Sequence, residues 1–269
     1  MVYKNRVEKI GIINMLEKIF NSNLYHKFLY YRYRFNQNIS TVYELLHQRA
    51  VEKSTDYIEN YLSEVLIFPS RESLWKYAVT HIEQKSRIIE LGVYKGYSIN
   101  NLADYSEKKN IDVWGFDTFE GLTESWFGTS FYSGSYSNEG LLPKTRSNVT
   151  LNKGDISETL QNFLKINNRK ISLIHFDLDT RSTTFKALNL LKSIIKEPIL
   201  LIFDEYHGFP AFENGEKAAW RDFALQENLS WRYLTFSNQQ ALIQVSIKKL
   251  KTAKELASHL PVYFRTQKI

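Results

Sequence analysis

The chain has 269 residues, a length that fits one large domain with additional segments better than two full domains. A hydrophobic content of 43% is sufficient for a buried core, and the absence of cysteine excludes disulfides, thiolate nucleophiles and cysteine-bound zinc. The formal net charge is +6, but Lys and Arg are spread along the chain. This distribution predicts no nucleic-acid partner and would suit a small anionic, phosphate-bearing substrate.

Residues 1–85 are expected to form a helical N-terminal extension. Ile10, Ile13, Leu16 and Phe20 fall on one helical face, and residues 25–35 interleave tyrosines with basic residues. Such a stretch is typical of a helix packed on its own domain or on a second subunit, with a membrane surface or RNA as alternatives. We expect the extension to support a homo-oligomer or to cover the substrate.

The sequence contains no signal-peptide pattern at its N-terminus and no run of about 18 apolar residues. It therefore predicts a cytoplasmic protein without a transmembrane segment.

From residue 86 onward, short apolar runs alternate with amphipathic stretches. The runs have the length and the flanking Gly, Asp or Asn of buried parallel strands, and they occupy residues 88–91, 113–116, 172–176 and 199–203. Helices are expected at residues 98–107, 183–195 and 220–227, followed by an antiparallel hairpin of residues 231–236 and 241–247. The alternation predicts an α/β fold with a parallel sheet and helices on both faces.

The one long region without periodicity is residues 123–147, which is rich in Gly, Ser and Tyr. A long loop of this kind inside a compact domain is usually functional, so we expect a lid. Trp126, Phe127 and Tyr132 are candidates for a pocket wall within it.

A glycine-containing turn follows the first predicted strand. Glu90, Gly92, Gly96 and Ser98 lie between the strand end and the start of the next helix. Glycine permits a positive φ and close approach of a ligand, and the new helix offers free N–H groups to an anionic ligand group. The Gly-x-x-x-Gly spacing differs from that of dinucleotide-binding turns.

Acidic residues end the next two strands. Asp117 closes an apolar run 27 positions after Glu90, at the sheet edge where a carboxylate can accept the ribose hydroxyls of a nucleoside. Asp155 follows another strand end at the same edge, where a simple turn is the alternative.

Four further acids follow the last two predicted parallel strands. Asp177 and Asp179 come after one, and Asp204 and Glu205 after the other. If these strands are neighbours, Asp177, Asp204 and Glu205 converge, and clustered carboxylates repel one another unless a cation lies between them. Oxygen ligands of this kind match Mg²⁺ best.

The order of these motifs resembles the macrocin O-methyltransferase family of class I S-adenosylmethionine-dependent methyltransferases. The resemblance covers residues 88–247 and rests on Glu90-x-Gly-x-x-x-Gly, Asp117-Thr-Phe-Glu-Gly-Leu122, Gly154-Asp155, Asp177-Leu-Asp-Thr-Arg-Ser-Thr183, Asp204-Glu205 and Gly215-Glu-Lys-Ala-Ala-Trp-Arg-Asp-Phe223. It implies a Rossmann-like domain over residues 86–269, with a seven-stranded, mostly parallel sheet and an antiparallel C-terminal hairpin. It also implies metal-dependent methylation of a sugar hydroxyl, nucleotide-linked or on a glycosylated natural product.

The resemblance assigns roles to particular residues. S-adenosylmethionine would contact Glu90, Gly92, Gly96, Ser98, Asp117, Thr118, Asp155, Ile156 and Asp177, with Asp117 at the ribose hydroxyls and Asp155 and Ile156 at the adenine. Asp177, Asp204 and Glu205 would hold Mg²⁺ or Mn²⁺, and Asp179 would be the general base. Two positions depart from the family pattern: Glu205 is usually Asp, and Arg181 is often Tyr.

Alternatives to this function differ in the residues that they need. His207, three positions after Asp204, is a second candidate base and would serve a metal-independent methyltransferase. A catalytically silent binding or scaffold protein of the same fold predicts missing ligand acids, yet all are present. A nicotinamide-dependent oxidoreductase is disfavoured by the glycine spacing.

Overall fold

The structure is a computed structural model that describes residues 27, 41–195 and 198–246. The chain divides into two compact units, Met1–Leu46 and His47–Ile269. The predicted helical face at residues 10–20 and, apart from Lys27, the aromatic stretch at residues 25–35 lie outside the described residues. None of the described helices is long and apolar enough to cross a membrane.

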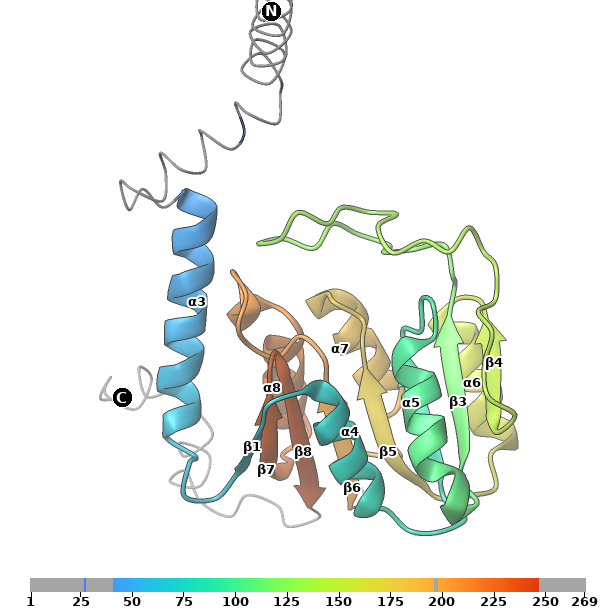
Figure 1. Cartoon of the computed structure of the whole chain (residues 1–269). Helices are drawn as coiled ribbons and strands as arrows, with labels where there is room; N and C mark the ends of the chain where they lie inside the picture. The colour runs from blue at the N-terminus through green and yellow to red at the C-terminus, as the bar shows by residue number, and fades with distance from the viewer. Residues whose placement is uncertain (1–26, 28–40, 196–197, 247–269) are drawn as a thin grey trace, which may run out of the picture. The chain divides into compact units, whose positions relative to one another are not determined.

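An eight-stranded sheet lies at the centre of the second unit (Figure 1), in the order β1-β7-β8-β6-β5-β2-β3-β4. Every neighbouring pair is parallel except those of β8, which runs antiparallel to β6 and β7. The predicted mostly parallel sheet with an antiparallel C-terminal hairpin is therefore confirmed. The strands are β1 Leu66–Phe68, β2 Arg87–Leu91, β3 Asp112–Asp117, β4 Val149–Lys153, β5 Ile171–Phe176, β6 Ile199–Phe203, β7 Ser230–Ser237 and β8 Gln240–Ser246.

The eighth strand comes from the region that the sequence predicts to be entirely helical. β1 pairs with β7, and the helix after it buries Leu74 and Trp75 in the core of the sheet. The sheet thus begins before residue 86, the predicted start of the domain. Three residues are too few to show a strand periodicity, and it is the pairing with β7 that makes this segment a strand.

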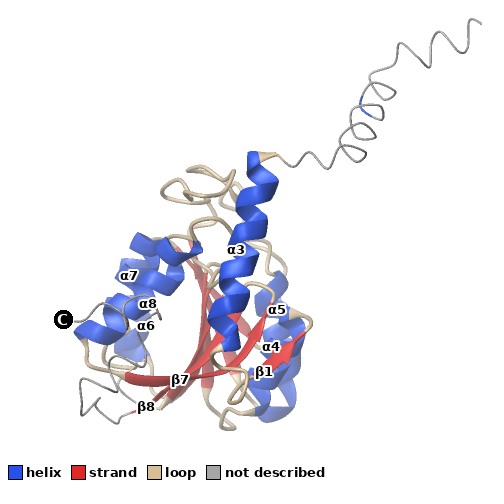
Figure 2. Ribbon diagram, turned by 90° about the vertical axis from the view of Figure 1, so that its left-hand side faces the viewer, coloured by secondary structure: helices blue, strands red, loops and turns tan. Residues whose placement is uncertain are grey.

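Helices cover both faces of the sheet. α4 and α5 lie on one face and α6, α7 and α8 on the other, as the two views show (Figures 1 and 2). Successive side chains of one strand point to opposite faces of the sheet. In β2, Ile88 therefore packs in the core under α4 and α5, and Ile89 packs in the core under the other three helices. The helices are α3 Val42–Glu59, α4 Arg71–Thr80, α5 Tyr97–Ser106, α6 Ile156–Ile166, α7 Arg181–Leu190 and α8 Glu216–Gln226, with 3₁₀ turns at η1 Glu107–Lys109 and η2 Phe212–Asn214.

Buried hydroxyl groups attach the second half of α3 to the sheet. The hydroxyl of Tyr233 lies 2.5 Å from that of Tyr57 and 2.6 Å from that of Tyr206. The Gly208 N–H donates to the Ser54 hydroxyl oxygen at 2.8 Å. Polar groups buried in this way are stabilising because they bond to one another.

The topology brings four strand ends to one edge of the sheet. In the sheet β6, β5, β2 and β3 are neighbours in this order, and they run parallel to one another. Their carboxyl ends, and the acids at those ends, therefore share this edge. The loop of residues 118–148 extends above the same edge (Figure 1).

Candidate active site

A cavity of about 870 Å³ opens at the carboxyl edge of the sheet. The predicted site residues that line it are Gly92, Ser98, Asp117, Thr118, Asp155, Ile156, Asp177, Asp179, Asp204 and Glu205. Glu90, Gly96 and His207 are not among its lining residues. The structure therefore brings ten of the predicted residues together around one space.

The turn after β2 depends on glycine for two different reasons. A Cβ atom on Gly92 would lie 1.7 Å from the carbonyl oxygen of Asp177, so only glycine allows β2 to lie this close to the end of β5. Gly96 has a φ of 79°, in the left-handed region, where it precedes α5. Glu90 is fully buried below the turn and accepts a hydrogen bond from the Ser98 hydroxyl at 2.9 Å.

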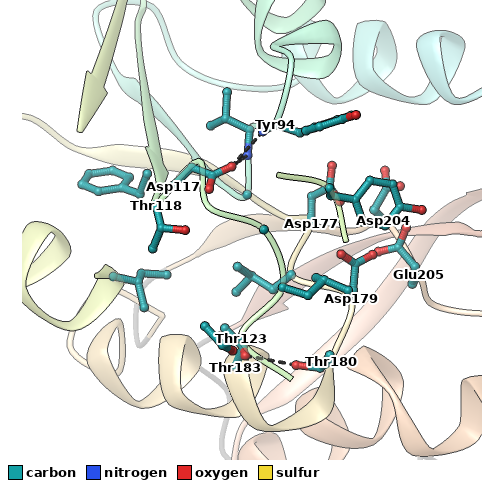
Figure 3. A pocket seen from close by; sticks show the side chains of 18 of the residues that line it. Tyr94, Asp117, Thr118, Thr123, Asp177, Asp179, Thr180, Thr183, Asp204 and Glu205 are labelled. Carbon is teal, nitrogen blue, oxygen red and sulfur yellow. Dashed lines mark hydrogen bonds between the residues drawn. The ribbon is translucent and has the colours of Figure 1, made fainter. Parts of the chain in front are cut away.

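Asp117 holds this turn from the neighbouring strand (Figure 3). Its Oδ2 accepts from the N–H groups of Val93 and Tyr94, each at 2.8 Å, and its Oδ1 accepts from the Phe119 N–H at 2.7 Å. A carboxylate has about four acceptor positions. One position is left for a donor on a ligand in the cavity.

Asp155 is the N-cap of α6. Its Oδ1 accepts from the Ser157 N–H at 2.7 Å, and the Lys186 Nζ lies 3.5 Å away. The hydrogen bonds from Ser157 lower the pKa of Asp155. The turn-and-cap alternative is therefore present in the structure, and an adenine contact of Asp155 and Ile156 stays a prediction.

Four acids gather where β5 and β6 end (Figure 3), and the two strands are parallel neighbours as the metal hypothesis requires. Ligand atoms of Asp177, Asp179 and Glu205 all lie within 4.8 Å of one another, and so do those of His175, Asp177 and Asp204. Asp177 belongs to both sets. Asp204 is thus grouped with His175, and Asp179, predicted as the base, with Asp177 and Glu205.

The electrostatics of this cluster favour a positive charge. Burial, together with the negative charges of Asp204 and Asp179, raises the pKa of Asp177 well above its usual value, and burial with the same neighbours raises that of Glu205. Burial and the charges of Asp204 and Asp117 raise the pKa of Asp179 to about 7. Glu205 Oε2 is buried without a hydrogen-bond partner among the described residues. Oxygen atoms in this state fit a divalent cation.

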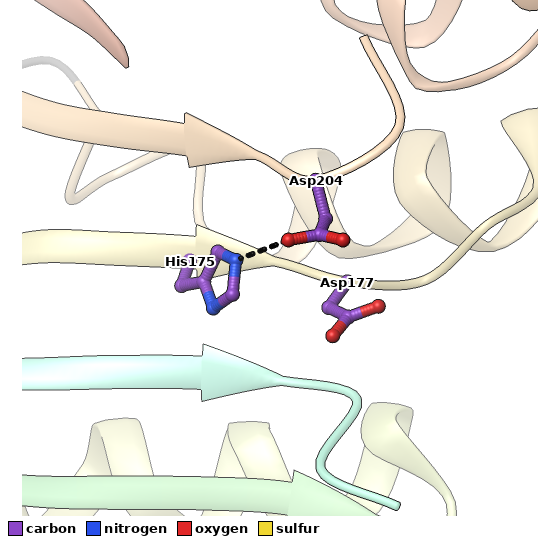
Figure 4. Close-up of side chains that lie close together, drawn as sticks. All are labelled: His175, Asp177 and Asp204. Atoms are coloured by element: carbon purple, nitrogen blue, oxygen red, sulfur yellow. Dashed lines mark hydrogen bonds and ion pairs between the residues drawn. The ribbon is translucent and has the colours of Figure 1, made fainter. Parts of the chain in front are cut away.

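His175 links two buried carboxylates. Its Nδ1 lies 3.0 Å from Glu90 Oε2 and its Nε2 lies 3.3 Å from Asp204 Oδ1 (Figure 4). Burial alone would lower the pKa of His175, but the hydrogen bonds with Asp204 and Glu90 and their charges raise it well above its usual value. The same contact lowers the pKa of Asp204 against the effect of burial. Since the Gln240 amide also donates to Asp204 Oδ1, this carboxylate is held in one orientation.

A fifth carboxylate, Glu216, fixes the backbone of both acidic turns. It is fully buried in the first turn of α8. Its Oε1 accepts from the Leu178 N–H at 3.0 Å and its Oε2 from the Glu205 N–H at 3.2 Å. Burial, with the charges of Asp179 and Asp204, raises the pKa of Glu216 to about 8 despite these two backbone hydrogen bonds.

Three non-glycine residues that line the cavity have a left-handed backbone, and Tyr94, with a φ of 49°, is one of them. Asp179 has a φ of 61° and Tyr136 a φ of 61°, in the region that non-glycine residues seldom adopt. Tyr136 lies in the long loop and lines the cavity, with its ring 5.5 Å from that of Tyr94. Burial and the nearby charges of Asp179 and Glu205 raise the pKa of Tyr136. Its phenol therefore stays protonated beside the acids.

His207 lies away from the cavity. It is buried, its Nε2 is 3.2 Å from the Gln240 carbonyl oxygen, and its ring packs edge-on against Phe236. Burial lowers the pKa of His207 to about 4. These contacts favour Asp179 over His207 as a base.

Sequence reasoning missed His175, Glu216 and Tyr136 as site residues. His175 lies in β5 two positions before Asp177, which directly follows the strand, so the strand period of two could have identified it. No local pattern distinguishes Glu216 from an ordinary first-turn glutamate of a helix. Tyr136 is one of several tyrosines in a loop without periodicity.

Residues 89–206 match a family model described as a methyltransferase domain. The crystal structure of CalS11, a calicheamicin methyltransferase, is 19% identical with a TM-score of 0.51, covering 77% of this chain and 94% of that chain. The O-methyltransferase NovP is 16% identical with a TM-score of 0.48, covering 65% and 79%. The O-methyltransferase from Bacillus cereus, solved with SAH, is 15% identical with a TM-score of 0.43, covering 80% and 96%. Comparison with curated proteins finds no match.

The likeness to CalS11 concerns the fold, and it agrees with the parallel sheet and its antiparallel hairpin. The family match spans β2 to the turn after β6, the segment that contains the glycine turn and the acid cluster. Residues 89–206 of this chain are therefore similar to a methyltransferase domain, and the fold is similar to that of CalS11.

Proposed function

We propose that this protein transfers a methyl group from S-adenosylmethionine to a hydroxyl oxygen of a small molecule, that this hydroxyl belongs to a sugar, and that the reaction requires Mg²⁺ or Mn²⁺. One observation carries the proposal: the turn held by Asp117 and the acid cluster of β5 and β6 line the same cavity. A nucleoside cofactor and a cation-dependent acceptor would thereby meet in one space.

The residues of the site would have different roles in binding and catalysis. Asp117 has one acceptor position left for a ribose hydroxyl. Asp177, Asp204 and Glu205 would hold the cation, with His175 and Glu216 orienting them. When bound, the cation supplies positive charge that lowers the pKa of an acceptor hydroxyl. Asp179 would take the proton of that hydroxyl.

The reaction balances without any other reactant. A bond forms between the acceptor oxygen and the methyl carbon while the bond from that carbon to the sulfonium sulfur breaks. The electron pair of the broken bond stays on sulfur, which becomes a neutral thioether. The hydroxyl proton goes to the Asp179 carboxylate.

The cytoplasmic location, the homo-oligomer and the absence of a nucleic-acid partner stay predictions.

Replacement of Asp117 by alanine tests the cofactor site. We expect Asp117→Ala to weaken S-adenosylmethionine binding by about 1–3 kcal/mol, because it removes an acceptor for the ligand and leaves the Val93 and Tyr94 N–H groups without their partner. Calorimetric titration measures this change, with nicotinamide cofactors as the negative comparison. Asp112→Asn, at the half-buried start of the same strand, is the matched control. Equal affinity of the wild-type protein and Asp117→Ala would remove Asp117 from the cofactor site.

A further inference from the structure

A second cavity, of about 590 Å³, adjoins the first. The two share Asp179, Thr180 and Ser182 among their lining residues. The second cavity extends from this junction between the start of α7 and residues 124–127 of the long loop. A molecule that occupies it can present a group to Asp179 while another ligand fills the larger cavity.

The wall formed by the loop is aromatic. Trp126 and Phe127 line the cavity from the loop, and Phe185 lines it from α7. Trp126 is anchored, with its ring 5.3 Å from that of Phe209, whereas Phe127 is 81% exposed. An exposed phenyl ring at the rim of a cavity offers a flat apolar face on which the apolar side of a ligand ring can stack.

The charges of the second cavity are negative on balance. Three of its lining residues carry carboxylates, Glu124, Asp179 and Asp222, and one lining residue, Arg181, is a cation. Arg181 already pairs with Asp222 at 2.5 Å. Among the lining side chains, therefore, no cation is left unpaired for a phosphate, and only backbone N–H groups of the first turn of α7 remain as donors of the kind that bind anions.

The net charge of the whole chain is +6, opposite in sign to the balance of charges in this cavity. The cations that line the site, Arg71, Lys95 and Lys186, belong to the larger cavity. A diphosphate placed in the second cavity would face Glu124 and Asp179, which have no ion pair among the described residues, and this repulsive arrangement selects against it.

We propose that the second cavity is the acceptor site, and that it takes an uncharged or amine-bearing ring compound with hydroxyl groups and one apolar face, while it rejects phosphate-bearing acceptors such as nucleotide-linked sugars. This inference rests on the proposed function for the identity of the reaction, and it narrows the sugar to one that carries no phosphate.

Binding of matched probes to the full chain tests the proposal. The probes are phenyl glucoside, its 2-amino derivative and UDP-glucose, each titrated by saturation-transfer NMR and calorimetry with S-adenosylhomocysteine present and absent. We expect the two phenyl glycosides to bind, and UDP-glucose to bind at least about 10-fold more weakly. Phe127→Ala should weaken the phenyl glycosides about 3–10-fold. Tyr132→Ala is the matched control, since Tyr132 is an exposed ring of the same loop that lines neither cavity.

Charge reversal at Glu124 is a second, independent test of the proposed selection against phosphate. Glu124→Lys should strengthen UDP-glucose binding about 10-fold and change phenyl glucoside binding little, because only the diphosphate responds to the sign of the charge. Tighter binding of UDP-glucose than of both glycosides by the wild-type protein would overturn the proposal. The proposal would also be overturned if neither glycoside bound at concentrations up to about 10 mM, which corresponds to a binding free energy of about 3 kcal/mol. S-adenosylhomocysteine binding is read in the same titrations, so a failure of the proposed function is seen separately.

Discussion

Chelation of divalent metal is expected to abolish methyl transfer, and added Mg²⁺ or Mn²⁺ is expected to restore it. The reason is the cluster of Asp177, Asp179, Asp204 and Glu205, of which the last three are buried, because these carboxylates repel one another without a cation. Asp204→Asn should lower activity at least about 100-fold, since even residues that only orient a metal ligand cost 10–100-fold. Affinity for S-adenosylmethionine should be retained, because Asp204 is not one of the residues proposed to contact it.

Two measurements separate metal binding from turnover. Mn²⁺ binding, followed by electron paramagnetic resonance, should weaken in Asp204→Asn. Asp104→Asn, which removes an exposed carboxylate paired with Arg146, should change neither quantity and is the matched control. Full activity in excess chelator, with an acceptor that is turned over, would show that the acid cluster is structural and would return His207 to consideration as the base.

Asp179→Asn is expected to lower kcat about 10²–10⁴-fold, the usual contribution of a general base. Asparagine is the suitable replacement because Asp179 has a φ of 61°, and Asn tolerates the left-handed region better than most residues. The backbone should therefore keep its course, and only the proton acceptor is lost. Activity is measured as release of S-adenosylhomocysteine at saturating cofactor.

The same variant distinguishes two roles that the geometry allows for Asp179. If Asp179 acts only as a base, the Asp179→Asn protein should bind Mn²⁺ with nearly the affinity of the wild-type protein. As a third ligand beside Asp177 and Glu205, its replacement should weaken Mn²⁺ binding together with turnover. Unfolding by denaturant provides the stability control. An Asp179→Asn protein with wild-type kcat would exclude both roles.

The amino-acid sequence by itself determined the parallel core and the edge at which the site lies. Apolar runs of five or six residues, such as those of β5 and β6, identify buried strands in the sequence. Parallel strands place their carboxyl ends at one edge of the sheet. The acids at the ends of such runs, Asp117, Asp177 and Asp204, are therefore expected from the sequence at one edge of the sheet, and in the structure all three line one cavity. Local pattern and chain connectivity were sufficient for this.

Tertiary structure alone decided the features that depend on contacts between distant segments. β1 is a strand because β7 lies beside it, and Glu216 is buried because α8 docks on the two acidic turns. His207 follows Asp204 by three positions, yet its contacts with Gln240 and Phe236 turn it away from the cavity. The charge of the second cavity also arises from packing, because Glu124, Asp179 and Asp222 are far apart in the sequence. Sequence patterns report the periodicity of single elements, whereas these outcomes depend on which elements meet.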